Sequence, residues 1–556
     1  MKTRIDGLIA RVCVLLAVLL ACLGGTKAVY GQALTAADFQ CFLDRWANND
    51  PYADCDGTGG LTANDFQCFL NRFAAADPYA NCDGSSGKGW TDLTPPPGAL
   101  VFYVATNGSD SNPGTMVLPF RTVSRGLSAL RDGHPDQLRL RCGDAWTEGG
   151  QLQITKGAGP TGYLVVGSYG TGPRPRIDFT GTSTGFYAGP QNKRGLAFIG
   201  LELAGLNRNL TNGITMLSWR DILIEDCAIR NFSAGVVVQD AESTGLNYRV
   251  TGFKARRNVI TDIDYINAPE SGRAQGIYMG GCDGWLVEEN VFDLCGVPGS
   301  IFGRPVYVHE TCGRGTYRGN ISARSRAEGF QVRPGGVVHN NLSLRCPIGM
   351  FIGNDSPGIS EITDNVVLES GDISSQHRRG VGIHIAGASI VRRNFVGYNT
   401  GSGWGSVHGF KCDAGEYTGN MVWNWTRDPN DGGPGDTREG TGFFFDGAGQ
   451  VTTVNNRIFQ PRPGIICEIG GWTLTGTGNQ WHQAPNSFWQ PFRGGGVPAG
   501  WTKVALPPDP RVRIQDLTGL TLEQWISEAR KQSRQNWRPE YTAANRNALV
   551  RSIVFP

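Results

Sequence analysis

The chain is poor in charge and lacks the short motifs that bind zinc. Only 18% of its 556 residues are charged, and 51 basic residues against 49 acidic ones leave a formal net charge of +2. A balance this close to neutral creates no field that would hold nucleic acid, so we expect no nucleic-acid partner. The histidines and cysteines form no His-x-x-x-His or Cys-x-x-Cys pair, and we expect no zinc site.

Long apolar runs are scarce as well. The one prominent run, Val12 to Leu23, follows Lys2 and Arg4 and precedes small residues that end near Gln32. This order is typical of a secretory signal peptide over residues 1–32. The run is too short to span a membrane, and no other run qualifies. We therefore expect an exported protein, secreted or at the cell surface, in which cysteines can oxidise.

Glycine, by contrast, is abundant, with 79 residues, and it is ordered. A four-residue segment of glycine or proline, an apolar residue, any residue and another apolar residue begins at Gly235, Gly276, Pro305, Gly329, Gly349, Gly382, Gly409, Gly442 and Gly464. Asparagines alternate with these segments, at Asn258, Asn290, Asn320, Asn341, Asn365, Asn394, Asn420, Asn456 and Asn479. Two interleaved ladders at a spacing of roughly twenty to thirty-odd residues predict a solenoid, in which each repeat packs on its neighbours.

Residues 33–84 contain a separate pattern, two near-identical copies of one sequence. Leu34-Thr-Ala-Ala-Asp-Phe-Gln-Cys is echoed by Leu61-Thr-Ala-Asn-Asp-Phe-Gln-Cys, and the apolar residues of each copy have helical spacing. Between the predicted helices, one segment fits a twelve-residue calcium loop, with oxygen ligands from Asp54, Asp56, Thr58, the Gly60 carbonyl and Asp65. We predict a Ca²⁺ site here. The alternative is a disulfide-stapled helical hairpin with an acidic turn.

This duplicated module resembles the dockerin-like, EF-hand-related domains attached to many bacterial exported proteins, with which it shares a final Asp in the loop. The resemblance implies attachment to a protein partner, with the chemistry elsewhere in the chain. Cys41, Cys55, Cys68 and Cys82 allow three disulfide pairings, among which the sequence does not choose. Residues 85–99, rich in Gly, Ser and Pro, predict a linker.

A different pattern starts at residue 100. Tyr103-Val-Ala-Thr-Asn-Gly-Ser-Asp, followed by Pro119-Phe-Arg-Thr-Val-Ser-Arg-Gly-Leu, resembles the opening of right-handed parallel β-helix proteins, the group that includes pectate lyases and many polysaccharide-active enzymes. The resemblance implies a mainly-β fold over residues 100–500, a three-sheet solenoid whose asparagines stack in the tight turn between the second and third sheets. It also implies that the loops before the glycine-led strands form the rim of a cleft.

Both ends of the solenoid have predicted helices. A helix over Val123–Leu130 would cap the first coil and protect its edge from pairing with other chains. After Trp501 the ladders stop, and the apolar spacing over Leu517–Arg534 predicts an amphipathic helix. We expect this helix, in a tail over residues 501–556, to cover the last coil or to lie along one face.

Strand alternation sorts the side chains of each glycine-led segment. The first and third residues after the glycine point inward, as in Ile277 and Met279 or Phe443 and Phe445. The second residues point outward: Val237, Tyr278, Tyr307, Gln331, Phe351, His384, Lys411, Phe444 and Ile466. The fourth residues also point outward: Gln239, Gly280, His309, Arg333, Gly353, Ala386, Asp413, Asp446 and Glu468. The pattern predicts one wall with a basic end, a shallow floor and an acidic end.

The acidic end, formed by Asp413, Asp446 and Glu468, permits two interpretations. Three stacked carboxylates repel one another unless a cation or a proton intervenes, which predicts a second Ca²⁺ site or a carboxylate pair with one raised pKa. Alternatively, the fourth position already belongs to a turn, and its carboxylates accept hydrogen bonds from turn amides.

The wall favours a lyase that cleaves an acidic polysaccharide by β-elimination, which needs a carboxylate neutraliser, a base and an acid. The catalytic candidates are His309, Arg333, His384, Lys411, Asp413 and Asp446, and the substrate-binding candidates are Tyr278, Tyr307, Gln331, Phe351 and Glu468. Lys254 with Arg273 resembles the lysine and arginine, about one coil apart, of some alginate and chondroitin lyases. The alternatives are a glycoside hydrolase using Asp413, Asp446 and Glu468, and a non-catalytic glycan-binding scaffold. We expect a monomer.

Overall fold

The computed structural model describes residues 42–43, 46, 55, 62–74, 90–160, 162–208, 211–241, 248–265, 272–353, 358–373, 380–400, 407–426, 440–485 and 490–555. The chain divides into two compact units, residues 1–92 and 93–556. The boundary between them falls within the predicted linker. The predicted signal peptide and the predicted ligands Asp54, Asp56, Thr58 and Gly60 lie outside the described residues.

In the first unit, helix α3 (Ala63–Ala74) follows the predicted calcium loop. Asp65 is buried, and its Oδ2 accepts hydrogen bonds from the backbone nitrogen (2.7 Å) and the hydroxyl (3.2 Å) of Thr62. Asp65 therefore closes the first turn of the helix. A Cys55–Cys68 disulfide selects one of the three pairings that the sequence left open. Phe42 and Phe69, one from each copy, stack at 3.9 Å between ring centroids, so the two copies pack together.

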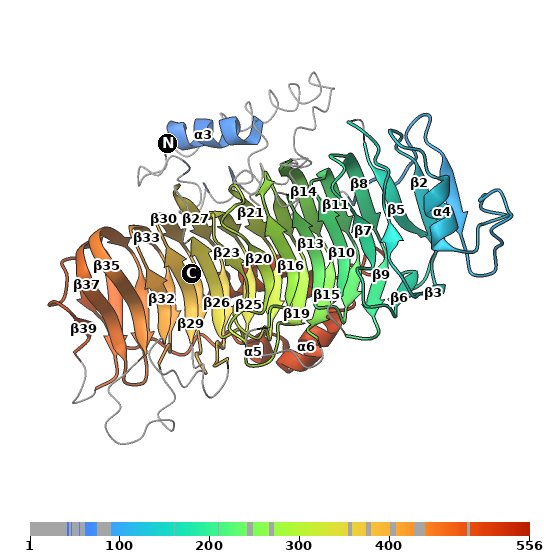
Figure 1. Ribbon diagram of the computed structural model, residues 1–556. Helices are drawn as coiled ribbons and strands as arrows, with labels where there is room; N and C mark the ends of the chain where they lie inside the picture. The colour runs from blue at the N-terminus through green and yellow to red at the C-terminus, as the bar shows by residue number, and fades with distance from the viewer. Residues whose placement is uncertain are drawn as a thin grey trace, which may run out of the picture. The chain divides into compact units, whose positions relative to one another are not determined.

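The second unit is a solenoid of parallel strands, from β1 (Val101–Val104) to β40 (Trp501–Lys503) (Figure 1). A coil contributes three strands, for example β16 (Gln275–Gly280), β18 (Leu286–Glu288) and β19 (Val291–Cys295). The first two strands of each coil belong to one sheet of 26 strands, and the third belongs to a sheet of 14. This is the architecture typical of a right-handed parallel β-helix, as the resemblance implied, and the ladders correctly predicted a solenoid. The strands form two continuous sheets, however, and not the three that were expected.

The solenoid begins with a capping helix, α4 (Val123–Ala129), whose first turn is capped by the Thr122 side chain. Val123 and Leu127 are buried in the same apolar core as Leu138 of the first coils. The helix covers the open end of the core (Figure 1), which confirms the predicted cap.

The asparagine ladder lies in the turn between the second and third strands of each coil; Asn258, for example, lies between β14 (Val250–Arg256) and β15 (Val259–Ile263). Eight hydrogen bonds of 2.9–3.1 Å join the nine predicted asparagines: from Asn290 onward, each Oδ1 accepts from the Nδ2 of the asparagine one coil earlier. The residue before each asparagine has a left-handed φ, between +51° and +67°. The stacked amides satisfy backbone groups that this sharp turn leaves without strand partners.

The C-terminal tail forms three helices instead of one. Gly519, at φ +73°, ends α5 (Ile514–Thr518), and α6 (Leu522–Ala529) and α7 (Ala543–Val554) follow. We call residues 512–555 the strap. Its apolar side chains, including Trp525 and Ile526, pack on the outer face of the 14-stranded sheet, and α5 and α6 lie along the side of the solenoid in Figure 1. The tail therefore covers one face rather than the last coil.

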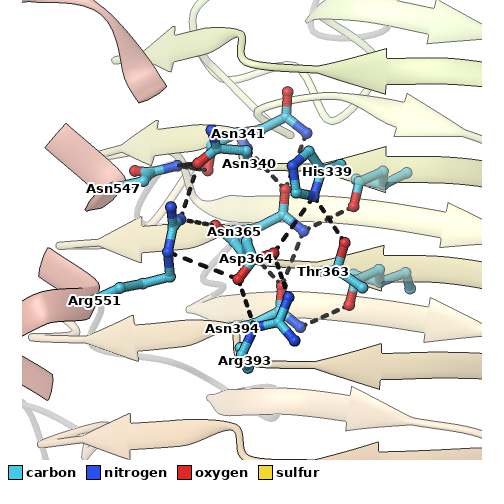
Figure 2. A network of polar contacts seen from close by, with 12 residues as sticks. His339, Asn340, Asn341, Thr363, Asp364, Asn365, Arg393, Asn394, Asn547 and Arg551 are labelled. Carbon is cyan, nitrogen blue, oxygen red and sulfur yellow. Dashed lines mark hydrogen bonds and ion pairs between the residues drawn. The ribbon is translucent and has the colours of Figure 1, made fainter. Parts of the chain in front are cut away.

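Polar contacts attach the end of the strap to the asparagine turn (Figure 2). Asn547 Nδ2 donates to the Asn341 carbonyl oxygen at 3.0 Å, and Arg551 donates to Asn340 Oδ1 at 2.9 Å. Arg551 also lies 3.7 Å from Asp364, which Arg393 binds at 2.7 Å. The turn is thus both the spine of the coil stack and the docking surface of the strap. In the described part of the chain, no helix is long and apolar enough to cross a membrane.

Candidate functional site

The glycine-led strands form the face that the sequence singled out, here called the first face. They are β13 (Ala234–Gln239), β16, β20 (Arg304–Val308), β23 (Gln331–Val332), β26 (Ile348–Gly353), β29 (Val381–Ala386), β32 (His408–Cys412), β35 (Thr441–Val454) and β37 (Ile465–Thr477). Tyr278, Tyr307, Gln331, Phe351, His384, Lys411 and Phe444 pair in that order from coil to coil. Eight of the nine segments thus have the predicted register, and we call their second residues the outward column.

The ninth segment has a different register. Thr441 pairs with Ile465, and Phe444 pairs with Glu468, so Glu468 continues the outward column and does not lie beside Asp446. Ile466, predicted to point outward, is fully buried. The strand begins only at Ile465, after Pro463-Gly464, and its residues pair two positions away from the register that the glycine predicted. In this coil, the glycine did not predict the register of the strand.

The predicted acidic end does not assemble. Asp413 accepts hydrogen bonds of 2.8 Å from the backbone nitrogens of Gly387 and Ala414, which is the turn role of the alternative interpretation. Glu468 lies 3.4 Å from Arg493 of the next coil. The side chain of Asp446 lies outside the described residues. Among the residues that the structure describes, no group of three or more His, Cys, Asp or Glu side chains is placed to hold a metal ion.

A groove of about 540 Å³ lies on the first face, toward the predicted basic end. Six predicted site residues line it together: Tyr307, Gln331, Arg333, Phe351, His384 and Lys411. Its rim comes from loops before the glycine-led strands, through Arg273, Ile301, Phe302 and Ile373, as the resemblance implied. The structure therefore brings most of the predicted catalytic and binding residues into one cavity.

Five further residues line the groove that the sequence analysis did not select: Gln275, Arg304, Glu328, Ile348 and Val381. Each immediately precedes the glycine or proline of its segment, and they pair from coil to coil as a second column. The residue before the glycine or proline recurs once per coil, as regularly as the residues of the outward column do. The repeat therefore contained the signal, but strand alternation alone did not predict that the residue before each glycine or proline lines the groove.

Charged and phenolic groups form a chain across one end of the groove. Arg304 and Glu328 are both buried, and their Nε and Oε2 atoms lie 2.7 Å apart. The Arg304 guanidinium lies over the Tyr307 ring, 4.8 Å from its centroid. Arg333 donates a 3.1 Å hydrogen bond to the Tyr307 hydroxyl and pairs with Glu310 at 2.5 Å. Tyr307 is thus contacted by two guanidinium groups, each of which is held by a carboxylate.

The aromatic rings of the outward column stack on one another. Phe351 and His384 are nearly parallel, with ring centroids 4.0 Å apart and an interplanar angle of 10°. Tyr278 and Tyr307 lie 5.9 Å apart. One face of the Tyr307 ring is covered by the Arg304 guanidinium and one face of the Phe351 ring by His384, so neither substrate-binding candidate presents both ring faces to a sugar.

Two predicted site residues lie beside the groove and do not line it. Tyr278 is half-buried, and burial raises the pKa of its phenol. His309 Nδ1 lies 3.0 Å from the Thr311 hydroxyl, and its Nε2 lies 3.3 Å from Glu310. His309 therefore contacts the carboxylate that holds Arg333 and does not face the cavity.

Lys254 and Arg273 do not form the pair that the resemblance to alginate and chondroitin lyases suggested. Lys254 belongs to β14 of the second strand family, where it pairs with Leu223 and Leu286, and burial lowers the pKa of its amine. Arg273 lines the groove on the first face and lies over the Phe302 ring at 5.6 Å. The two residues belong to different faces of the solenoid.

No protein-family model matches the chain, and no curated protein matches it in sequence. Among solved structures, a mutant of the periplasmic alginate epimerase AlgG is 10% identical, with 64% of this chain and 80% of that one covered and a TM-score of 0.39. The GH136 lacto-N-biosidase from Eubacterium ramulus is 12% identical, with 80% and 71% covered and a TM-score of 0.34. Pectate lyase Pel9A is 13% identical, with 72% and 78% covered and a TM-score of 0.25. The chemistry of the site is therefore argued from its own residues.

Proposed function

We propose that the groove binds an acidic polysaccharide along the solenoid axis and cleaves it by β-elimination at a uronic acid. The observation that carries the proposal is the charge of the lining: Arg273, Arg304, Arg333 and Lys411 stand against one carboxylate, Glu328. That carboxylate is already paired with Arg304. Arg333 is likewise paired with Glu310. The four cationic lining side chains still outnumber these two carboxylates, which gives the groove a charge complementary to a polyanion.

The length of the groove suits a chain rather than a single sugar. The outward column advances about 4.8 Å per coil, so Tyr307 and Lys411, four coils apart, lie roughly 19 Å apart along the axis. Cations at both ends of this span would hold consecutive acidic units. Arg333, beside Tyr307, is the candidate that neutralises the uronate carboxylate at the reacting unit, since a guanidinium binds a carboxylate with two parallel hydrogen bonds.

A glycoside hydrolase is the weaker alternative at this site. Its usual mechanism needs two carboxyl groups on opposite sides of the scissile bond. Of the residues described as lining the groove, only Glu328 carries a carboxylate. Asp413 is bound to turn amides, and Glu468 lies two coils beyond Lys411 in the outward column.

We also propose that the protein is exported as a monomer and that residues 33–84 attach it to a protein partner through a Ca²⁺-stabilised module. The Cys55–Cys68 disulfide supports an oxidising compartment. The duplicated sequence and the packing of Phe42 on Phe69 support a paired-helix module. Loss of helical signal on chelation of Ca²⁺, restored by adding the ion back, tests the metal.

The function is tested by incubating the full chain with uronate polymers and with a neutral glucan as control. A lyase yields products that absorb in the ultraviolet through a new C4=C5 double bond. New reducing ends without this absorbance would indicate a hydrolase, and retention on a polymer without either product would indicate a scaffold. If no acidic polymer is cleaved or bound, the proposal is wrong.

A further inference from the structure

Resting on the proposed β-elimination, we infer that Tyr307 carries the proton in the reaction, rather than serving as a stacking platform for the sugar. Its hydroxyl accepts the hydrogen bond from Arg333, so its own hydrogen is left to point elsewhere. A second guanidinium, that of Arg304, lies over the ring. The two guanidinium groups thus place positive charge beside the hydroxyl oxygen and over the ring, where it faces the negative charge that develops as the proton moves.

The carboxylates behind the two arginines give the arrangement its rigidity. Glu328 binds Arg304 and Glu310 binds Arg333, so neither guanidinium depends on substrate for its position. The buried pair of Arg304 and Glu328 cannot relax into solvent, and separating it would leave an uncompensated charge. Glu328 and Glu310 are therefore positioning residues for the groups that contact Tyr307.

The neighbouring Tyr278 shows what the same residue type looks like without this arrangement. It pairs with Tyr307 one coil away in the outward column, but it does not line the groove. The rings of Tyr307 and His309 lie next to Tyr278, and burial raises the pKa of the Tyr278 phenol. Tyr278 is thus a matched internal control for the role of Tyr307.

The other candidates in the groove lie elsewhere along the axis. His384 is three coils from Tyr307, a separation of roughly 14 Å. It lies beside Lys411 rather than Arg333, so it would contact a different sugar unit. Tyr307 alone among the groove's acid–base side chains combines a position at the cavity with direct contact to the candidate carboxylate neutraliser.

The step balances without any further reactant. The Tyr307 phenolate removes the C5 proton of the uronate, and the electron pair of that C–H bond forms the C4=C5 double bond. The C4–O bond breaks, and its electron pair stays on the leaving oxygen. Tyr307, now a phenol, returns the proton to that oxygen, so one side chain serves first as base and then as acid.

The test compares Tyr307→Phe with Tyr278→Phe in the full chain. Each substitution removes one hydroxyl and keeps the ring, so similar unfolding temperatures are expected. Tyr307→Phe should lower kcat by a factor on the order of 10² to 10⁴ with KM within about twofold, whereas Tyr278→Phe should stay within about threefold of the wild type.

Each outcome of this experiment is decisive. Cleavage that persists at the wild-type rate in Tyr307→Phe would overturn the role of Tyr307 and leave the proposed function intact. A wild-type protein that cleaves no uronate polymer would overturn the proposed function and the inference with it. If Tyr307→Phe fails to fold, Arg333→Gln replaces it. Loss of the donor to the phenol should then lower kcat at least tenfold, and an unchanged kcat would contradict the inference.

Discussion

The turn between the second and third strands of each coil and the groove on the first face both stack polar side chains from coil to coil, but in different ways. The turn repeats one residue: nine asparagines joined by eight hydrogen bonds along the stack. The outward column of the groove changes residue at almost every coil, from Tyr307 to Gln331, Phe351, His384 and Lys411. Uniform stacking satisfies the backbone of the solenoid, whereas varied stacking offers a sequence of different groups to a ligand.

Burial differs in the same way. Asn341 is buried and makes all its contacts within the protein, at 3.0 Å to the Tyr317 carbonyl and 3.0 Å to Asn365. Lys411 and His384 remain partly exposed and line a cavity. Substitutions in the turn should therefore change stability, and those in the groove should change binding or rate. The predictions below test that division, from the largest expected effect to the smallest.

Asn341→Ala should cost the most stability. It removes two donated hydrogen bonds and leaves the Asn320 backbone and side-chain nitrogens without their acceptor. Each buried polar group left unsatisfied costs about 1–3 kcal/mol, so we expect a loss of about 3–5 kcal/mol, measured by urea unfolding. Lys411→Ala in the groove, where the side chain is partly exposed, is the control and should lose less than about 1 kcal/mol. Equal losses would contradict the division.

Arg530→Ala should loosen the strap. Its guanidinium bonds to Asp293 at 2.6 Å and to Asp262 at 3.1 Å, and Asp293 is fully buried. Arg324 still binds Asp293 after the substitution, so we expect a moderate loss of about 2 kcal/mol. Hydrogen exchange should rise in α6, and protection in β14 and β15 should stay. Unchanged protection of α6 would show that apolar packing alone holds the strap.

Removing cations from the groove should weaken binding without weakening the fold. For Arg273→Gln with Lys411→Gln, we expect about tenfold lower affinity for a uronate oligomer, roughly 1.4 kcal/mol, and a smaller dependence of affinity on salt. Arg392→Gln, on the second strand family of a coil that contributes to the groove, is the matched control. Calorimetric titration at two salt concentrations measures both. An equal effect of Arg392→Gln would show nonspecific attraction.

His339 should make the turn mildly sensitive to acid. Burial lowers the pKa of His339 to about 4, Asp364 opposes this shift, and Arg551 and Arg393 add to it (Figure 2). Between pH 6.5 and 4 the unfolded chain binds a proton that the folded chain does not, so the stability present near pH 7 is lost as pH falls.

About a quarter of the His339 side chain is exposed, and water reduces the effect, so we expect a loss of only about 1 kcal/mol between pH 7 and pH 5. In His339→Gln the same pH change should cost measurably less. Thermal unfolding of both proteins at the two pH values measures the difference. Identical losses would show that His339 does not contribute. The pKa of Asp364 is held below its usual value by Arg393 and Arg551 despite burial, so its own contribution is lost only at lower pH.

Much of the solenoid could be predicted because its rules are local and repeat. The asparagine ladder, the inward residues such as Ile277 and Phe443, and the cap at Val123 all follow from spacing and alternation. The prediction was wrong at Glu468, whose strand pairs two positions away from the register that the glycine predicted. The predicted C-terminal helix is present as α6, but it is shorter than Leu517–Arg534, since Gly519 adopts a left-handed conformation and ends α5 before it.

The sequence by itself determined the repeat, its turn and the face whose side chains vary, because every coil of a parallel solenoid repeats the same local pattern. Only the tertiary structure decided which of those side chains meet. Arg304 and Glu328 lie 24 residues apart in sequence and 2.7 Å apart in space. Tyr307 is contacted by both Arg304 and Arg333, and strand alternation did not predict that these two arginines would meet at one residue. An ion pair or a cavity forms between side chains of different coils. Its geometry therefore depends on how neighbouring coils and their loops pack, which the pattern within one coil does not specify.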